Sequence, residues 1–361
     1  MTQSWKGKSK GNTLGYRIFI AVLRFAGIRP AYFLLRFVTF WYFLFSSSFW
    51  YMYSYFRRRI GFGKLRSYLS VYKNYYALGG QDWDPEQSRL SEVAQVSMLQ
   101  NLLTEDNLPS YHREIAMNFG MDGPWGQWVN RWTAEENRHG IALRDYLVVT
   151  RAIDPIELEQ LRIEQMTRGF SPGQNQQGDL FAESLFDSVI YVTFQELATR
   201  VSHRNTGKAC DETVADQLLQ RVSADENLHM IFYRDVSEAG FDIAPDQAMH
   251  SLHRVLVNFK MPGFTVPEFR RKAVIIAVGG VYDPRIHLDD VVMPVLKKWR
   301  IFERDDFTGE AARKRDELGK LVEELQETCE KFEVAKQRRL ERQAKVAEKK
   351  AAKNLVSSSA S

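Results

Sequence analysis

The chain has 361 residues, 44% of them hydrophobic, and a formal net charge of +4 at pH 7. This length is enough for one large or two ordinary domains with a sizeable core. Its only cysteines, Cys210 and Cys329, form no Cys-x-x-Cys motif, which argues against a disulfide framework or a cysteine zinc site and favours a reducing cytoplasm.

Charge is distributed unevenly along the chain. Residues 1–72 contain twelve Lys or Arg and no Asp or Glu, so all 45 acids lie in the remainder. Residues 336–353 are again basic, with eight Lys or Arg and two acids, which leaves residues 73–335 with a net charge of −14. The chain is therefore expected to have a basic head, an acidic body and a basic tail. We expect no nucleic acid among its partners.

The head contains a long aromatic segment. Residues 37–56 run for twenty positions without a charge, twelve of them aromatic, and Arg57, Arg58 and Arg59 follow. Twenty helical residues span about 30 Å, roughly one hydrocarbon core, and flanking arginines can reach lipid headgroups. We expect a membrane-spanning or interfacial helix that attaches a cytoplasmic protein to a membrane. The alternative is an aromatic helix buried against another domain.

The head also resembles a known family. The stretches KGKSKGNTLGYRIF, RPAYFLLRFVTFWYFLFS and RRRIGFGKLRSYLSVYKNYY are similar to the N-terminus of bacterial lipid A acyltransferases. The catalytic His-x4-Asp motif of that family does not follow, because residues 1–72 contain no histidine. The resemblance therefore implies membrane association without acyltransferase activity, and a fusion near Lys73.

Two Glu-x-x-His motifs occur in the body, Glu136 to His139 and Glu226 to His229. Each lies in a predicted helix, over residues 125–139 and 212–236, where positions i and i+3 share one face. A carboxylate and an imidazole then point into the same space. A single motif of this kind is a weak signal for a metal site.

An internal repeat strengthens the signal. Glu105 lies 31 residues before Glu136, and Glu196 lies 30 residues before Glu226. Thirty residues correspond to about one helix, a connection and half of the next helix. Each unit is thus predicted to be two helices facing a common axis, and two units make an all-α, ferritin-like four-helix bundle with six inward ligands.

The predicted ligands also suit particular metals. Four buried carboxylates would be costly without compensation, and two divalent cations balance their charge. A carboxylate-rich set with two imidazoles and no cysteine favours iron or manganese over copper or zinc. The alternative is four exposed acids on helix faces and two ordinary histidines.

Longer stretches of the body resemble the soluble acyl-carrier-protein desaturases, especially the actinobacterial ones. The segments are LLTEDNLPSYHREIA, WVNRWTAEENRHG, YVTFQELATRVSH, SADENLH, FKMPGFTVPEFRRKAV and GGVYDPRIHLDDVVMPVLKKWRIFER, and the similarity covers residues 73–345. The resemblance implies O2-dependent desaturation of a fatty acyl chain on acyl carrier protein, two irons cycling between Fe2+ and Fe3+, a ferredoxin-type electron donor and a homodimer. The implied iron ligands are Glu105, Glu136, His139, Glu196, Glu226 and His229, with Glu136 and Glu226 bridging.

The resemblance also implies roles for three further residues. Thr199, one turn after Glu196, would lie beside the oxygen-binding face, or alternatively bond its own backbone. Trp83 and Asp225 would belong to an electron route that ends at His139, with Asp225 orienting the imidazole. A core position is the alternative for Trp83. The strongest basic cluster for an acidic carrier protein is formed by Lys260, Arg270, Arg271 and Lys272, with an ordinary solvated surface as the alternative.

We therefore expect three parts: a head over 1–72, a ferritin-like desaturase domain over 73–309, and a C-terminal helix with a basic tail over 310–361. Two other functions stay open. A related di-iron oxygenase could hydroxylate another substrate, or the fusion could yield an inactive product. The acyl chain length and the double-bond position do not follow from the sequence.

Overall fold

The structure, a computed structural model, describes residues 83–168, 185–261, 263, 266 and 268–358, together with single positions between residues 18 and 54. The chain forms two compact units, Met1–Asp84 and Pro85–Ser361. The predicted aromatic helix over 37–56 lies almost entirely outside the described residues. Within the described part of the chain, no helix is long and apolar enough to cross a membrane.

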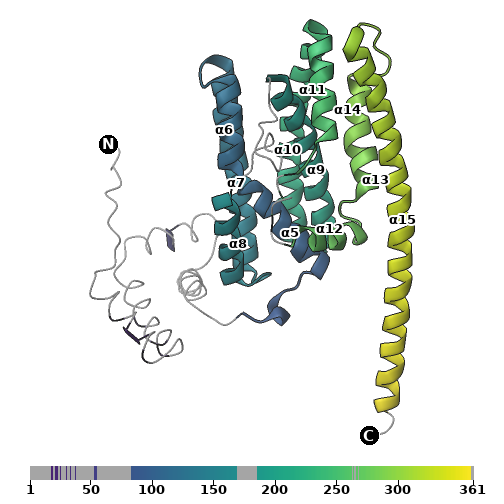
Figure 1. The fold of residues 1–361 in the computed structure, drawn as a ribbon. Coiled ribbons are helices and arrows are strands. Elements are labelled where there is room, and N and C mark those ends of the chain that lie inside the picture. The colour runs from purple at the N-terminus through teal and green to yellow at the C-terminus, as the bar shows by residue number, and fades with distance from the viewer. Residues whose placement is uncertain are drawn as a thin grey trace. The chain divides into compact units, whose positions relative to one another are not determined.

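Every regular element in the described ranges of the second unit is helical (Figure 1). In chain order the elements are η1 (Pro85–Gln87), α5 (Glu92–Glu105), α6 (Leu108–Phe119), α7 (Gly123–Val149), α8 (Pro155–Arg168), α9 (Leu185–Cys210), α10 (Thr213–Ile243), α11 (Pro245–Val257), α12 (Phe269–Val278), α13 (Pro284–Ile286), the π-helix η3 (His287–Val292), α14 (Met293–Lys298) and α15 (Gly309–Ser358). This confirms the all-α prediction.

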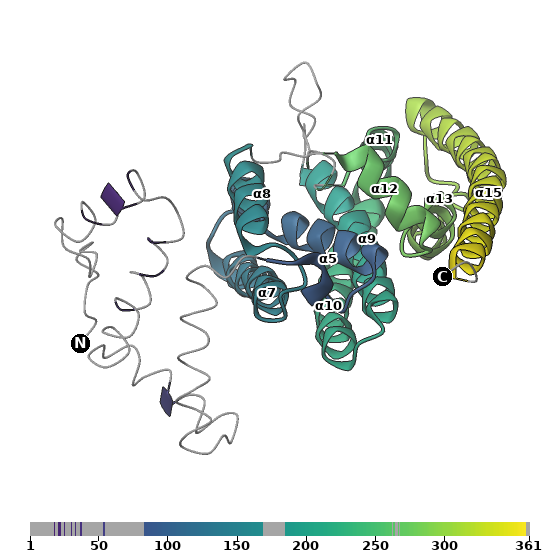
Figure 2. The ribbon, with the colours of Figure 1, turned by 90° about the horizontal axis from the view of Figure 1, so that it is seen from below.

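Four helices form a closed bundle. α5 packs on α7 and α9, and α10 packs on the same two helices from the other side (Figure 2). The α9–α10 contact is the most extensive, and every residue from Asp187 to Thr199 of α9 is buried. α9 therefore runs through the interior, as expected of a helix that is apolar on several faces. The ferritin-like four-helix bundle predicted from the repeat is confirmed.

Helix starts follow from local capping. The hydroxyl of Ser91 accepts a hydrogen bond from the backbone N–H of Ala94 at the start of α5. The carboxylate of Glu212 accepts bonds from the first backbone N–H groups of α10, where the helix dipole also favours a negative charge. Only Asp211 and Glu212 separate α9 from α10, so the two helices must run antiparallel.

The apolar core is divided into two clusters along the bundle. On α7, Val129 and Trp132 belong to one cluster, whereas Leu143 and Leu147 belong to the other. On α10 the same division falls between Leu219 and Met230. Both Glu-x-x-His motifs lie between the clusters. A buried polar band therefore crosses the middle of the bundle.

Candidate metal centre

Six side chains from the four bundle helices meet in this polar band. α5 contributes Glu105 from its last turn, and α9 contributes Glu196 from its buried middle. α7 and α10 each contribute a Glu-x-x-His pair from one helix face. Their ligand atoms form two groups, within each of which all lie within 4.8 Å of one another: Glu105, Glu136, His139 and Glu226, and then Glu136, Glu196, Glu226 and His229.

Glu136 and Glu226 belong to both groups, which is the arrangement needed for carboxylates that bridge two metal ions. Each group also has one histidine of its own and one further carboxylate. The structure therefore brings together all six residues that the sequence singled out. Their role as iron ligands stays a prediction.

One buried atom of each of the six residues makes no hydrogen bond within the described part of the chain. These atoms face one another at short range: Nδ1 of His229 lies 2.8 Å from Oε1 of Glu136, and Nδ1 of His139 lies 3.0 Å from Oε1 of Glu226. Buried polar atoms are nearly always hydrogen-bonded. The atoms without a hydrogen bond are Glu105 Oε2, Glu136 Oε1, His139 Nδ1, Glu196 Oε2, Glu226 Oε1 and His229 Nδ1. Converging oxygen and imidazole nitrogen atoms of this kind fit a pair of divalent metal ions.

The outer nitrogen of each histidine faces a carboxylate. Nε2 of His139 lies 3.4 Å from Asp225, and Nε2 of His229 lies 3.0 Å from Glu135. An N–H donated to these carboxylates fixes the ring so that Nδ1 points at the centre. Asp225 also accepts a hydrogen bond from Arg138. The predicted contact of Asp225 is present, and its part in electron transfer stays a prediction.

The two carboxylates that belong to only one group, Glu105 and Glu196, have partners that were not predicted from the sequence. Glu105 lies 2.8 Å from Nε2 of His203, and Glu196 accepts a 3.1 Å hydrogen bond from the indole of Trp132. Helical spacing could have found both. His203 follows Glu196 by seven residues and Trp132 precedes Glu136 by four, so each lies on a metal-facing side of its helix.

The hydroxyl of Thr199 contacts one of the six residues of the site and also makes the backbone contact that was the alternative role for it. Its hydroxyl lies 2.6 Å from Oε2 of Glu226, and 3.0 and 3.1 Å from the backbone oxygens of Glu196 and Gln195. A hydroxyl donates one hydrogen, and a charged acceptor at the shortest distance is the strongest partner. Thr199 thus contacts a carboxylate that the two groups share. Its catalytic role stays a prediction.

The buried charges shift one another's pKa. Burial and repulsion from Glu226 raise the pKa of Glu136 to about 8. Burial likewise raises the pKa of Glu196. Burial disfavours the charged forms of Glu226 and His139 too, but their close contact outweighs it, so the pKa of Glu226 is lowered and that of His139 is raised to about 12. In the metal-free protein, protons therefore supply positive charge that metal ions would displace.

Trp83 lies in the first compact unit, whereas the metal centre lies in the second. The electron route proposed for Trp83 therefore stays a prediction. The three-part division of the chain also stays a prediction.

Comparison with known proteins identifies the family. A family model described as fatty acid desaturase matches residues 69–350. The chain belongs to the fatty acid desaturase family. This desaturase is 76% identical over 283 residues to a Mycobacterium tuberculosis protein named as an acyl-[acyl-carrier-protein] desaturase, DesA1, a match that covers 78% of this chain and 84% of that protein.

More distant relatives are also similar to the desaturase. It is 27% identical over 254 residues to the chloroplastic stearoyl-[acyl-carrier-protein] 9-desaturase 6 of Arabidopsis thaliana, covering 65% of this chain and 63% of that protein. An X-ray structure of DesA2 from Mycobacterium tuberculosis H37Rv matches with a TM-score of 0.47 and 27% identity, covering 62% of this chain and 82% of that one.

These matches confirm the resemblance of the body to acyl-carrier-protein desaturases and the prediction that the chain is an oxidoreductase. The family match begins at residue 69. The likeness of residues 1–72 to lipid A acyltransferases, and with it the fusion, therefore stays a prediction.

Proposed function

We propose that the protein introduces a cis double bond into a fatty acyl chain carried on acyl carrier protein, using two iron ions and O2. The observation that carries this proposal is the set of six buried atoms without a hydrogen bond on four helices, arranged as two groups that share two carboxylates. The names of the relatives DesA1 and stearoyl-[acyl-carrier-protein] 9-desaturase 6 support the substrate class.

The residues present fit a pair of iron ions. Four carboxylates balance the charge of two divalent cations, and no cysteine lies among the six residues. Oxygen-rich coordination with one imidazole in each group favours iron or manganese over zinc or copper. When bound, iron would supply the oxidising power, with O2 as acceptor, to remove hydrogen from two adjacent methylene groups.

The protein's own residues orient the ligands and exclude water. Each of the six side chains is at most 3% exposed, so bulk water is kept from the centre. Asp225 and Glu135 hold the outer N–H of the two imidazoles, and His203 and Trp132 hold the two non-bridging carboxylates. The hydroxyl of Thr199 provides a proton donor at Oε2 of Glu226. Ligands fixed in this way need little rearrangement when metal binds.

Partners follow from the same proposal. A carrier protein is acidic, and Arg270 and Arg271 at the start of α12 are exposed cations that could attract it. We infer a ferredoxin-type electron donor, a homodimer and a cytoplasmic location, as the family resemblance implies. Attachment to a membrane through residues 37–56 also remains a prediction.

The proposal is tested by metal analysis followed by product analysis. Full-length protein is expected to contain two iron ions per chain, and to convert stearoyl carrier protein to an unsaturated product that mass spectrometry detects. Glu136→Gln and His229→Gln should each lower the iron content and abolish turnover. Retention of two irons by both variants would refute the ligand assignment. A hydroxylated product would instead point to the related oxygenase.

A further inference from the structure

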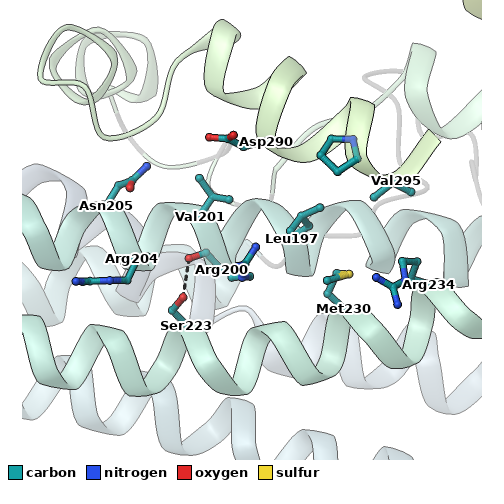
Figure 3. A pocket seen from close by; sticks show the side chains of 11 residues that line it. Leu197, Arg200, Val201, Arg204, Asn205, Ser223, Met230, Arg234, Asp290 and Val295 are labelled. Carbon is teal, nitrogen blue, oxygen red and sulfur yellow. Dashed lines mark hydrogen bonds between the residues drawn. The ribbon is translucent and has the colours of Figure 1, made fainter. Parts of the chain in front are cut away.

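A cavity of about 530 Å³ lies between α9, α10 and the segment formed by η3 and α14. Arg200 and Arg204 of α9 and Arg234 of α10 line it, and Figure 3 shows Arg200 between the other two. Leu197 and Met230 in its lining directly follow Glu196 and His229. Successive helical residues are rotated by about 100°, so the cavity occupies the helix faces that neighbour the metal centre.

The positive charge of the cavity is only partly compensated. Arg204 pairs with Asp216 at 2.6 Å, and Arg234 pairs with Asp235 at 2.8 Å, neither of which lines the cavity. Within the described residues Arg200 forms no ion pair. A guanidinium has five N–H donors, so the two paired arginines keep donors for another acceptor.

Arg200 and Arg204 are also one helical turn apart, where like charges repel. Among the described lining residues the only acid is Asp290 of the π-helix, and its side chain is exposed. The described lining thus carries three positive charges against one negative charge. An anion with several acceptor atoms would offset this imbalance.

Asn205 and Ser223 also line the cavity, but both donate hydrogen bonds to backbone oxygens. The rest of the lining is apolar and defines the remainder of the ligand. Leu197, Met230 and Val295 are buried and contribute to the cavity wall. No aromatic side chain lines the cavity among the described residues, so nothing there stacks on a nucleobase. A phosphate group on a short apolar chain would place oxygens on the arginines and carbon against the wall. Arginine pairs bidentately with carboxylates and phosphates alike, but a phosphate monoester offers three acceptor oxygens and up to two negative charges to the three arginines.

We propose that this cavity is a binding site for a phosphate monoester with a short apolar group, held by Arg200, Arg204 and Arg234 and separate from the metal centre. Such a ligand would bridge the outer faces of α9 and α10. These two helices carry three of the six metal ligands, so occupancy would stiffen the scaffold of the metal centre.

Isothermal titration of the iron-loaded, full-length protein with hexyl phosphate, inorganic phosphate and hexanoate tests the proposal. Hexyl phosphate should bind at one site per chain and more tightly than either other probe. Arg200→Gln should weaken hexyl phosphate binding about tenfold or more, because a charge-assisted bond is lost. Arg200→Lys keeps the charge but loses the planar guanidinium. Its affinity for hexyl phosphate should therefore lie between that of the unmodified protein and that of Arg200→Gln.

Arg339→Gln is the matched control, since this exposed arginine lies on α15 away from the cavity. It should bind hexyl phosphate as the unmodified protein does. Thermal unfolding establishes that each variant is folded. The proposal is overturned if Arg200→Gln binds hexyl phosphate with unchanged affinity, which is the result expected if the ligand binds at the iron centre instead. It is also overturned if Arg339→Gln loses as much affinity, or if no saturable binding occurs at millimolar concentration.

Discussion

The two carboxylates behind the histidines give a matched pair of perturbations. Glu135→Gln and Asp225→Asn each remove a negative charge from the acceptor of an imidazole N–H while keeping the size of the side chain. Loss of such an outer partner typically weakens metal binding about 10–100-fold, or about 1.4–2.8 kcal/mol. The distances decide which variant loses more. Glu135 lies 3.0 Å from His229, whereas Asp225 lies 3.4 Å from His139.

Asp225 also divides its charge among other partners. Arg138 lies 3.2 Å from Oδ2, the same oxygen that faces His139, so less negative charge is committed to the imidazole. The arginines near Glu135 instead lie at Oε1 and leave Oε2 to His229. We therefore expect Glu135→Gln to approach a 100-fold loss of iron affinity and Asp225→Asn to stay near tenfold.

The assay is competition for ferrous iron with a chelator of known affinity, under anaerobic conditions. Glu159→Gln is a suitable control, because Glu159 pairs with Arg144 and Arg162 and touches none of the six ligands. Unchanged iron affinity in Glu135→Gln, or a larger loss in Asp225→Asn, would refute this account of how the histidines are held.

Three further predictions concern the bundle and its centre. Thr199→Val keeps the side-chain shape but removes the hydroxyl at Glu226, so turnover should fall by about tenfold or more while iron content, measured by atomic absorption, stays unchanged. In the metal-free protein Glu136 keeps a proton below pH 8, because its pKa is about 8, and metal must displace that proton. Iron affinity, measured by titration, should therefore rise about tenfold per pH unit for each proton released between pH 6 and 8. Leu143→Ala should lower the free energy of unfolding by about 2–5 kcal/mol in chemical denaturation, since Leu143 is fully buried.

The four-helix bundle could be predicted from the sequence because the spacing of the ligands and the helical periodicity indicate the same arrangement of helices. Two Glu-x-x-His motifs can face each other only if their helices pack side by side, and the preceding glutamates supply the other two helices. The structure indeed brings Glu105 and Glu196 to the two motifs. The arrangement of the ligands was therefore accessible from residue type and spacing alone.

The partners of the ligands were harder to predict because they depend on packing between helices. His203 lies 98 positions from Glu105 in the chain, and Trp132 lies 64 positions from Glu196. Periodicity places each on the correct face of its helix, but it does not say which neighbour that face meets. The arginine cavity depends on three separate segments meeting, and no motif marks it.

The two ligand groups make two halves of the bundle depend on each other, the half formed by α5 and α7 and the half formed by α9 and α10. Each half donates its central glutamate to the other half's group, so that Glu226 completes the set around His139 and Glu136 completes the set around His229. Neither helix pair alone, α5 with α7 or α9 with α10, therefore holds a complete ligand group. Bound metal would link the α5–α7 pair to the α9–α10 pair. Chelation should therefore weaken the packing between the two pairs before the helices of either pair unfold. Two helix pairs related by two-fold symmetry would each give one glutamate to the other in this way, which gives the internal repeat a physical reason.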